Sequence, residues 1–406
     1  MGNPIQRALA RVEALGRRSD HPDYLVRTFL SDASKSAARL ILGWMKEAGM
    51  EAQMAADGTV RGILPGEDPQ APPFVIGSHH DTVIDAGKYD GALGIISAIA
   101  AVETLREEGI LLPITVHVLG FSDEEGIRFH STYLGSKSVA GLLDVDALAA
   151  ADSDGITVSE AIKSDGFRDG ISPILYQPGG ILGYIELHIE QGRVLESENL
   201  SVCAVSGISG QTRLVVNLTG RADHAGTTPI PLRRDALTGA AECILAAERL
   251  AKENPPLVIT VGRIEVHPGA SNSVPQSARF TVDLRHPEDS SRKQFLEQLR
   301  VVYETSAAAR GLDFKWSIAQ DSDAVPCDAA LTNRLLDVLE EQTGTAICLA
   351  SGAGHDAVVM STLGPVAMIF VRCRDGLSHH PDEHASPEDI ASGIKVLVGF
   401  LKSFQT

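Results

Sequence analysis

Residues 74–91, Phe-Val-Ile-Gly-Ser-His-His-Asp-Thr-Val-Ile-Asp-Ala-Gly-Lys-Tyr-Asp-Gly, decide the fold of this 406-residue chain. An apolar run ends directly in a cluster of His and Asp, and an apolar pattern of helical length follows Gly91. A second apolar run, 114–121, ends in the acidic stretch Ser122–Gly126. Ligands of open α/β sheets bind beyond the carboxyl ends of the strands. The two stretches therefore predict a functional site at one edge of a sheet.

The composition is that of an ordinary globular protein, with 44% apolar and 22% charged residues. The formal net charge of −18 argues against nucleic acid or an anionic membrane surface as a partner. Five scattered cysteines without CxxC spacing predict reduced thiols in a cytoplasmic protein. Residues 1–20 lack the apolar stretch of a signal peptide. No run approaches the roughly 18 apolar residues of a membrane span.

The order of expected strands and helices predicts one domain inserted into another, as suits a chain of this length. Two helices, expected at 3–29 and 32–49, precede the alternating strands and helices of an α/β sheet. Residues 208–321 instead follow the order β-α-β-β-α-β, which is typical of a ferredoxin-like α+β domain. The α/β pattern then resumes. We therefore predict a first domain formed by 1–207 and 322–406 that carries the inserted domain 208–321.

Several residues at or just beyond strand ends carry the side chains that divalent metals prefer: His79, Asp90, Glu125, His188 and His379. Neutral imidazole and carboxylate are the ligands that suit zinc and similar ions. Asp81 follows His79 by two residues, so it could accept the proton on the second ring nitrogen and fix the tautomer. One such residue alone would be an ordinary loop residue. Their recurrence at separate strand ends favours a metal site.

The doublet Glu124–Glu125 is the sharpest local feature of the sequence. Two adjacent carboxylates that leave a buried strand repel each other, which is hard to explain by packing. The conflict is resolved if one carboxylate binds a metal and the other stands beside an activated water. The alternative is a pair of glutamates on an exposed turn.

Six motifs, in order along the chain, resemble those of one enzyme family: Gly77–Val83, Lys88–Gly91, Ser122–Gly126, Glu186–Gly192, His224–Pro229 and Gly376–Glu383. The family comprises N-carbamoyl-L-amino-acid hydrolase, β-ureidopropionase and allantoate amidohydrolase, which are dinuclear-metal amidohydrolases of the aminoacylase–carboxypeptidase superfamily. The resemblance runs from about residue 20 to the end of the chain. It implies a mixed-sheet α/β catalytic domain with an inserted ferredoxin-like domain for dimerisation, which also serves as a lid.

The resemblance further implies two divalent metal ions per subunit, bridged by Asp90. His79 and His188 would complete one metal site, and Glu125 and His379 the other. Zinc is the expected ion, and manganese, cobalt and nickel are alternatives because such donors accept all of them.

Two further roles are expected near the metals. By resemblance, Glu124 would be the general base for a metal-bound hydroxide. Gln191 follows the expected strand that carries His188, so it could hydrogen-bond the substrate. His188 favours the ureido branch, because the peptidase branches carry a carboxylate at that ligand position.

The inserted domain would supply substrate contacts in a homodimer. By resemblance, His224 would stabilise negative charge on the substrate, and Asn272 and Arg285 would bind its carboxylate, all three reaching the site of the other subunit. The planar guanidinium of Arg matches a carboxylate. An ion pair of Arg285 with Asp283 or Glu288 is the structural alternative.

The expected reaction is hydrolysis of the ureido C–N bond of N-carbamoyl-L-amino acids to amino acid, ammonia and CO₂. The main alternative is allantoate amidohydrolase, whose ureido substrate also bears a carboxylate. β-Ureidopropionase is a further alternative, as is an aminoacylase or dipeptidase, which His188 disfavours. A non-catalytic binding homologue is disfavoured because the full set of candidate ligands and Glu124 is present.

Overall fold

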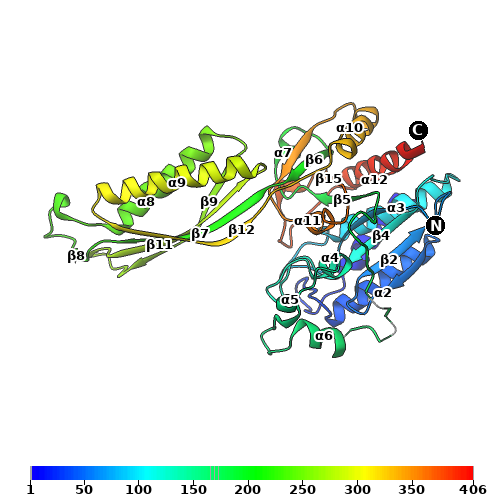
Figure 1. Ribbon diagram of the computed structural model, residues 1–406, viewed down its shortest axis with the longest axis horizontal. Coiled ribbons are helices and arrows are strands. Elements are labelled where there is room, and N and C mark those ends of the chain that lie inside the picture. The colour runs from blue at the N-terminus through cyan, green and yellow to red at the C-terminus, as the bar shows by residue number, and fades with distance from the viewer. Residues whose placement is uncertain (1, 165, 169, 172, 406) are drawn as a thin grey trace. The chain divides into compact units, whose positions relative to one another are not determined.

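The computed structural model describes residues 2–164, 166–168, 170–171 and 173–405. The chain divides into two compact units: Met1–Gly207 with Cys327–Thr406, and Ile208–Pro326 (Figure 1). The predicted inserted domain, 208–321, falls within the second unit. Among the described residues no helix combines the length and the apolarity needed to cross a membrane.

The larger unit is built on a mixed sheet, which confirms the predicted α/β fold class. Its strands follow the order β1-β2-β4-β3-β5-β15-β6, and β14 also pairs with β6. Strands β4, β3, β5 and β15 are neighbours that all run parallel, whereas the β1–β2, β2–β4 and β15–β6 pairs are antiparallel. The bounds are β1 Glu51–Met54, β2 Val60–Leu64, β3 Phe74–His79, β4 Val116–Phe121, β5 Gly183–Ile189, β6 Val202–Ile208, β14 Cys348–Ser351 and β15 Val366–Val371.

Helix α3 is the central helix of the larger unit and explains the apolar run after Gly91. It spans Ala92–Glu107 and is buried on nearly every side, packed against β3 and β5 and against helices α1 and α12. The other helices of this unit are α1 Pro4–Gly16, α2 Asp32–Glu47, α4 Leu134–Val139, α5 Val145–Ala149, α6 Val158–Ser164, α7 Val194–Ser197, α10 Ala329–Thr343, α11 Ala357–Met360 and α12 Pro387–Lys402, with 3₁₀ turns η2 Arg374–Gly376 and η3 Ser403–Gln405.

The helix expected over 3–29 was wrong beyond its first half, because α1 ends at Gly16. Pro22 disfavours helix in the residue before it. In addition, the buried guanidinium of Arg27 contacts the backbone at the end of α1. Arg27 Nη1 donates to the carbonyl oxygens of Leu15 and Arg18 at 2.9 and 3.0 Å. These contacts hold the backbone of Leu15 and Arg18 where α1 ends.

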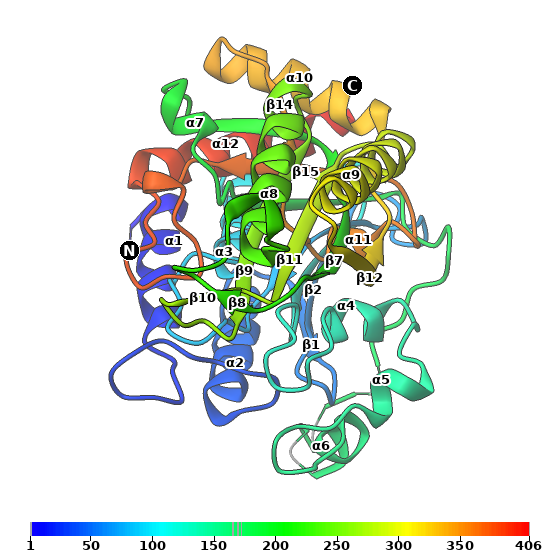
Figure 2. The same cartoon turned by 90° about the vertical axis from the view of Figure 1, so that its left-hand side faces the viewer.

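The second unit is a four-stranded antiparallel sheet in the order β12-β7-β11-β9, the arrangement expected of a ferredoxin-like domain. Helices α8 and α9 lie side by side on one face of this sheet (Figures 1 and 2). The bounds are β7 Gly210–Thr219, α8 Ala236–Glu253, β9 Val258–His267, β11 Ser277–His286, α9 Asp289–Ala309 and β12 Asp313–Ser322, with short elements β8 Asp223–His224, η1 Ile230–Leu232, β10 Ser273–Val274 and β13 Val325–Pro326.

Candidate metal centre

Parallel neighbours β4, β3, β5 and β15 place their carboxyl ends at one edge of the sheet, and the candidate ligands come from this edge. His79 is the last residue of β3, and His188 lies near the end of β5. The Glu124–Glu125 doublet follows β4, and His379 lies in the loop after β15. The sheet therefore gathers residues that are up to 300 positions apart in the chain.

Asp90 enters this edge from the loop between β3 and α3. The residue after it, Gly91, has a φ of +63°, and a Cβ there would lie 2.4 Å from atoms of the His79 ring. Only glycine fits this turn, because any side chain would be both strained and in collision. Gly91 thus lets the Asp90 carboxylate and the His79 imidazole approach each other.

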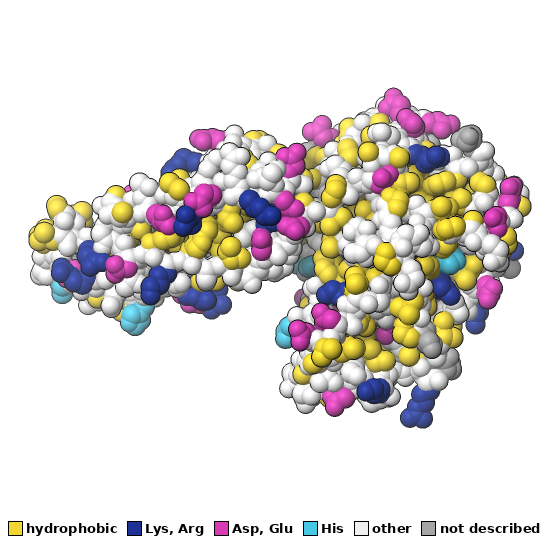
Figure 3. Space-filling model, in the orientation of Figure 1, with side chains coloured by type: hydrophobic (Ala, Val, Ile, Leu, Met, Phe, Trp, Pro, Cys, Tyr) yellow, Lys and Arg dark blue, Asp and Glu magenta, His cyan; other side chains and the backbone are white. Residues whose placement is uncertain are grey.

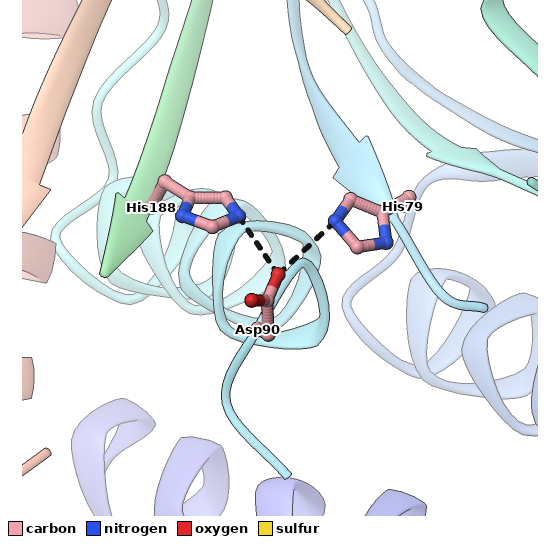
Figure 4. Close-up of side chains that lie close together, drawn as sticks. All are labelled: His79, Asp90 and His188. Carbon is pink, nitrogen blue, oxygen red and sulfur yellow. Dashed lines mark ion pairs between the residues drawn. The ribbon is translucent and has the colours of Figure 1, made fainter. Parts of the chain in front are cut away.

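The two oxygens of Asp90 face different imidazoles. Oδ1 lies 3.3 Å from His79 Nε2 and 3.1 Å from His188 Nε2 (Figure 4). Oδ2 lies 3.5 Å from His379 Nε2, which is also 3.1 Å from Glu125 Oε1. Ligand atoms of His79, Asp90 and His188 lie within 4.8 Å of one another, as do those of Asp90, Glu125 and His379. The five predicted ligands therefore form two groups that share Asp90.

Asp81 connects the His79 ligand to the Glu124–Glu125 doublet. Its Oδ1 lies 3.2 Å from His79 Nδ1, the ring nitrogen that faces away from Asp90. The same carboxylate accepts the backbone N–H groups of Glu124 and Glu125 at 2.9 and 3.1 Å. One buried carboxylate thus orients an imidazole ligand and the turn that carries the two glutamates.

The electrostatics of the site are those of a crowded, buried acidic cluster. Burial opposes a charge on His79, but hydrogen bonds to Asp81 and Asp90 outweigh it and raise the pKa well above its usual value. The hydrogen bond between His379 and Glu125 raises the pKa of His379 to about 9. Burial raises the pKa of Glu124 well above normal, and the neighbouring Glu125 adds to the effect. Protonation of these side chains reduces the net negative charge of the cluster, and a bound divalent cation could reduce it instead.

The donor set fits a divalent cation. Three imidazoles and the Asp90 and Glu125 carboxylates are the neutral nitrogen and anionic oxygen donors that zinc and related ions bind. Four of the five are at most 10% exposed, whereas 48% of the His379 side chain is exposed. His379 also has a φ of +57°, a conformation that costs energy and recurs at functional sites.

Gln191 lies beside Asp90. Its Nε2 donates to Asp90 Oδ2 at 2.8 Å and to Ser378 Oγ at 3.1 Å, while its buried Oε1 has no hydrogen-bond partner among the residues that the structure describes. The predicted role of Gln191 in substrate binding stays a prediction, and the contact with Asp90 is an addition that the sequence did not show.

His224 and Asn272 are brought together in the inserted unit. Strand β8 pairs with β10, which places His224 opposite Ser273, and the backbone N–H of Ala225 donates to the Asn272 carbonyl oxygen at 3.0 Å. Both predicted substrate-binding side chains are exposed.

Arg285 is not brought to His224 and Asn272. It lies on β11 opposite Gln211, whereas the paired strands β8 and β10 lie next to the other end of β11, where β10 leads into Ser277. From Ser277 to Arg285 the strand rises by about 27 Å at roughly 3.4 Å per residue. Arg285 instead forms a two-bond ion pair with Asp283, at 2.8 and 2.9 Å. One copy of this unit therefore cannot place all three residues in one small-molecule site.

Residues for which the sequence predicted no role also line the candidate metal centre. Ser378 donates to Asp90 Oδ2 at 2.5 Å, and Glu383 accepts the backbone N–H of Asp90 at 3.0 Å. The buried His355 ring packs edge-on against His188, with ring centroids 4.5 Å apart. Ser378 and Glu383 lie in the motif around His379, and His355 lies in the glycine-rich turn Ser351–Asp356. The only hint of their roles in the sequence was therefore that each lies within such a motif.

Comparison with known proteins gives concordant findings. A family model described as Peptidase family M20/M25/M40 matches residues 67–403. Allantoate deiminase of Arabidopsis thaliana is 42% identical over 98% of this chain and 82% of that protein. N-carbamoyl-L-amino-acid amidohydrolase of Pseudomonas sp. (strain NS671) is 38% identical over 97% of this chain and 96% of that protein. A crystal structure of an amidase of the hydantoinase/carbamoylase family from Burkholderia multivorans superposes with a TM-score of 0.92 at 32% identity, covering 98% of this chain and 97% of that one.

Proposed function

Because the chain belongs to peptidase family M20/M25/M40, a family of metal-dependent hydrolases, and its relatives include amidohydrolases, we propose that it hydrolyses a ureido C–N bond. The substrate would be a small molecule that also carries a carboxylate. The observation that supports this most strongly is the convergence of His79, Asp90, His188, Glu125 and His379 beside Glu124 at one sheet edge. On the face drawn in Figure 3, Lys and Arg form no continuous basic surface, in keeping with a substrate other than nucleic acid.

Two divalent ions are proposed, because Asp90 presents one oxygen to each of two ligand groups. His79 and His188 would hold one ion with Asp90, and Glu125 and His379 would hold the other. When bound, such a pair would polarise the substrate carbonyl and lower the pKa of a water molecule.

Glu124 is the proposed general base and acid. Its backbone N–H is fixed by Asp81, and its carboxylate belongs to the cluster of His79 and Glu125. It would take a proton from the attacking water on one carboxylate oxygen and pass it to the departing nitrogen. Addition of water and cleavage of the ureido C–N bond release an amine, ammonia and CO₂.

The inserted unit would serve two active sites of a homodimer. His224 and Asn272 cannot act in the same site as Arg285 of the same chain, because β11 separates them. Arg285 lies opposite Gln211, close in sequence to Gly207, where the larger unit ends. We therefore assign Arg285 to the site of its own chain and His224 with Asn272 to the site of the partner. This differs from the expectation that His224, Asn272 and Arg285 all reach the site of the other subunit.

Allantoate is the first substrate to test. The relatives named allantoate deiminase include one at 42% identity, compared with 38% for the N-carbamoyl-L-amino-acid amidohydrolase of Pseudomonas. N-carbamoyl-L-amino acids are the second candidate, because that relative matches almost the full length of both chains. Both substrates present a ureido group and a carboxylate to the same set of side chains.

A substrate panel tests this proposal. Purified metal-loaded protein is assayed with allantoate, N-carbamoyl-L-methionine, β-ureidopropionate and N-acetyl-L-methionine, and kcat/KM is measured for each. We expect a ureido substrate to reach about 10⁴ M⁻¹ s⁻¹ or more, within the usual range for enzymes, with ammonia released. A protein that cleaves only the N-acetyl compound would contradict the proposal.

A further inference from the structure

A second buried glutamate, Glu383, holds the loop that carries Asp90. Glu383 Oε1 accepts the backbone N–H groups of Tyr89 and Asp90 at 2.8 and 3.0 Å. Glu383 is 4% exposed and follows His379 in the loop after β15. A loop near the end of the chain is thereby fastened to the loop between β3 and α3.

Ser378 extends this connection to the carboxylate itself. Its Oγ donates to Asp90 Oδ2 at 2.5 Å and lies 3.3 Å from Glu383 Oε2. The approach of Glu383 depends on Gly87, because a Cβ there would lie 2.3–2.4 Å from atoms of the Glu383 side chain. Backbone and side chain of Asp90 are therefore both fixed by the Ser378–Glu383 pair.

We propose that Glu383 and Ser378 are positioning residues that aim the two oxygens of Asp90 at the two halves of the metal centre. The inference rests on the proposed function, because it takes Asp90 as a shared ligand. Neither residue is a predicted ligand, and Glu383 acts through the backbone of the Asp90 loop and through Ser378.

The physical reason is that a bridging carboxylate has little tolerance for rotation. Oδ1 must face His79 and His188 while Oδ2 faces His379. Ten residues separate Asp90 from His79, and the Oδ2 oxygen of Asp90 accepts hydrogen bonds from Ser378 Oγ and from Gln191 Nε2. Partners that orient a ligand commonly change metal affinity by about 10- to 100-fold.

Zinc binding to metal-free protein, measured by competition with a chromophoric chelator, tests the proposal without using activity. Glu383→Ala should weaken binding about 10- to 100-fold, and Ser378→Ala should weaken it in the same direction. Glu383→Gln should stay within about threefold of wild type, because its amide oxygen can still accept both N–H groups and its NH₂ can donate to Ser378 Oγ.

Asp152→Ala is the matched control. Asp152 is partly buried and likewise accepts two backbone N–H groups, those of Asp154 and Ile156 at 3.0 Å, and its carboxylate lies 3.0 Å from Arg128 Nε. This variant should lose thermal stability and keep its zinc affinity, which separates a general loss of stability from loss of positioning. Glu383→Gln and Ser378→Ala keep the test available should Glu383→Ala fail to fold.

The outcomes separate this inference from the function on which it rests. Wild-type zinc affinity in both Glu383→Ala and Ser378→Ala would overturn the positioning role and leave the proposed function intact. A wild-type protein that binds no divalent ion would overturn both.

Discussion

At the scale of single residues, Asp90 is the centre of the candidate site. It is the one predicted ligand that lies within 3.5 Å of three imidazoles, and each of its oxygens has its own set of neighbours. Glu124 lies in the same cluster with no imidazole ion pair of its own among the described residues. This difference supports a division in which Asp90 holds metal and Glu124 moves protons.

Glu124→Gln should separate these two roles. The amide keeps the shape of the side chain but cannot take a proton from water, so kcat should fall by about 10²- to 10⁴-fold. Metal content, measured by atomic emission, should stay at the wild-type level. Glu125→Gln is the comparison variant, and it should lose metal together with activity. Normal turnover by Glu124→Gln would show that another group is the base.

The candidate ligands could be predicted from the sequence because each belongs to a short motif at a strand end. The contacts of Gln191, Ser378 and Glu383 with Asp90 could not, since they join segments about 100 to 290 residues apart. Arg285 shows the same limit. Its motif suggested a carboxylate partner, but only the strand register shows how far it lies from His224.

At the scale of elements, four parallel strands and the helix α3 position the centre. The alternation of apolar runs with helical patterns predicted this arrangement, and the predicted fold class is confirmed. The β-α-β-β-α-β order of the inserted unit is likewise confirmed by its sheet. The end of α1 at Gly16 was not visible in the periodicity of residues 17–29, where the buried Arg27 side chain donates instead to the carbonyl oxygens of Leu15 and Arg18.

Strand β4 carries a histidine that makes stability depend on pH. Burial, aided by Arg61, lowers the pKa of His117 to about 4, and its Nδ1 lies 2.6 Å from the Tyr176 hydroxyl. Below about pH 6.5 the unfolded chain binds a proton that folded His117 does not. The free energy of unfolding should therefore fall as the pH drops from about 6.5 to about 4, by at most about 2 to 3 kcal/mol.

The measurement is urea unfolding of metal-free protein at pH 7.5, 6, 5 and 4.5, compared with His117→Gln. Other groups titrate in both proteins, so the prediction concerns their difference. The variant should lose less stability than wild type between pH 7.5 and 4.5. Parallel curves would contradict a neutral, partly buried His117.

At the scale of the whole molecule, the inserted unit carries substrate-binding candidates at two separate places. The assignment to two sites of a homodimer predicts a specific pattern of complementation. A heterodimer of His224→Ala and Arg285→Ala chains, isolated with two affinity tags, keeps one site with all its residues. It should have about half the wild-type activity, because a two-fold symmetric dimer has two equivalent sites.

The control pairing is Asp90→Ala with Arg285→Ala, which should stay inactive because each site then lacks one residue. Asp90→Ala with His224→Ala should again recover about half. Activity in the control pairing, together with none in the pairing of His224→Ala with Arg285→Ala, would mean that Arg285 crosses to the partner. Failure of every pairing would argue against shared sites.

The family and the type of reaction were predicted from motifs spread over the chain, and the comparisons confirm them. The choice between allantoate and N-carbamoyl-L-amino acids could not be predicted in this way. Both substrates would use the same proposed metal ligands, and the side chains that distinguish them would contact the rest of the substrate, where the sequence offers no motif.

Metal-dependent ureido hydrolysis can be tested by a single metal titration. Ammonia released from allantoate and N-carbamoyl-L-methionine is measured after metal is stripped with a chelator and then restored stepwise with zinc or manganese. We expect loss of activity on stripping and recovery that saturates at about two ions per chain. Full activity of the metal-free protein, or no ureido hydrolysis with any divalent ion, would contradict it.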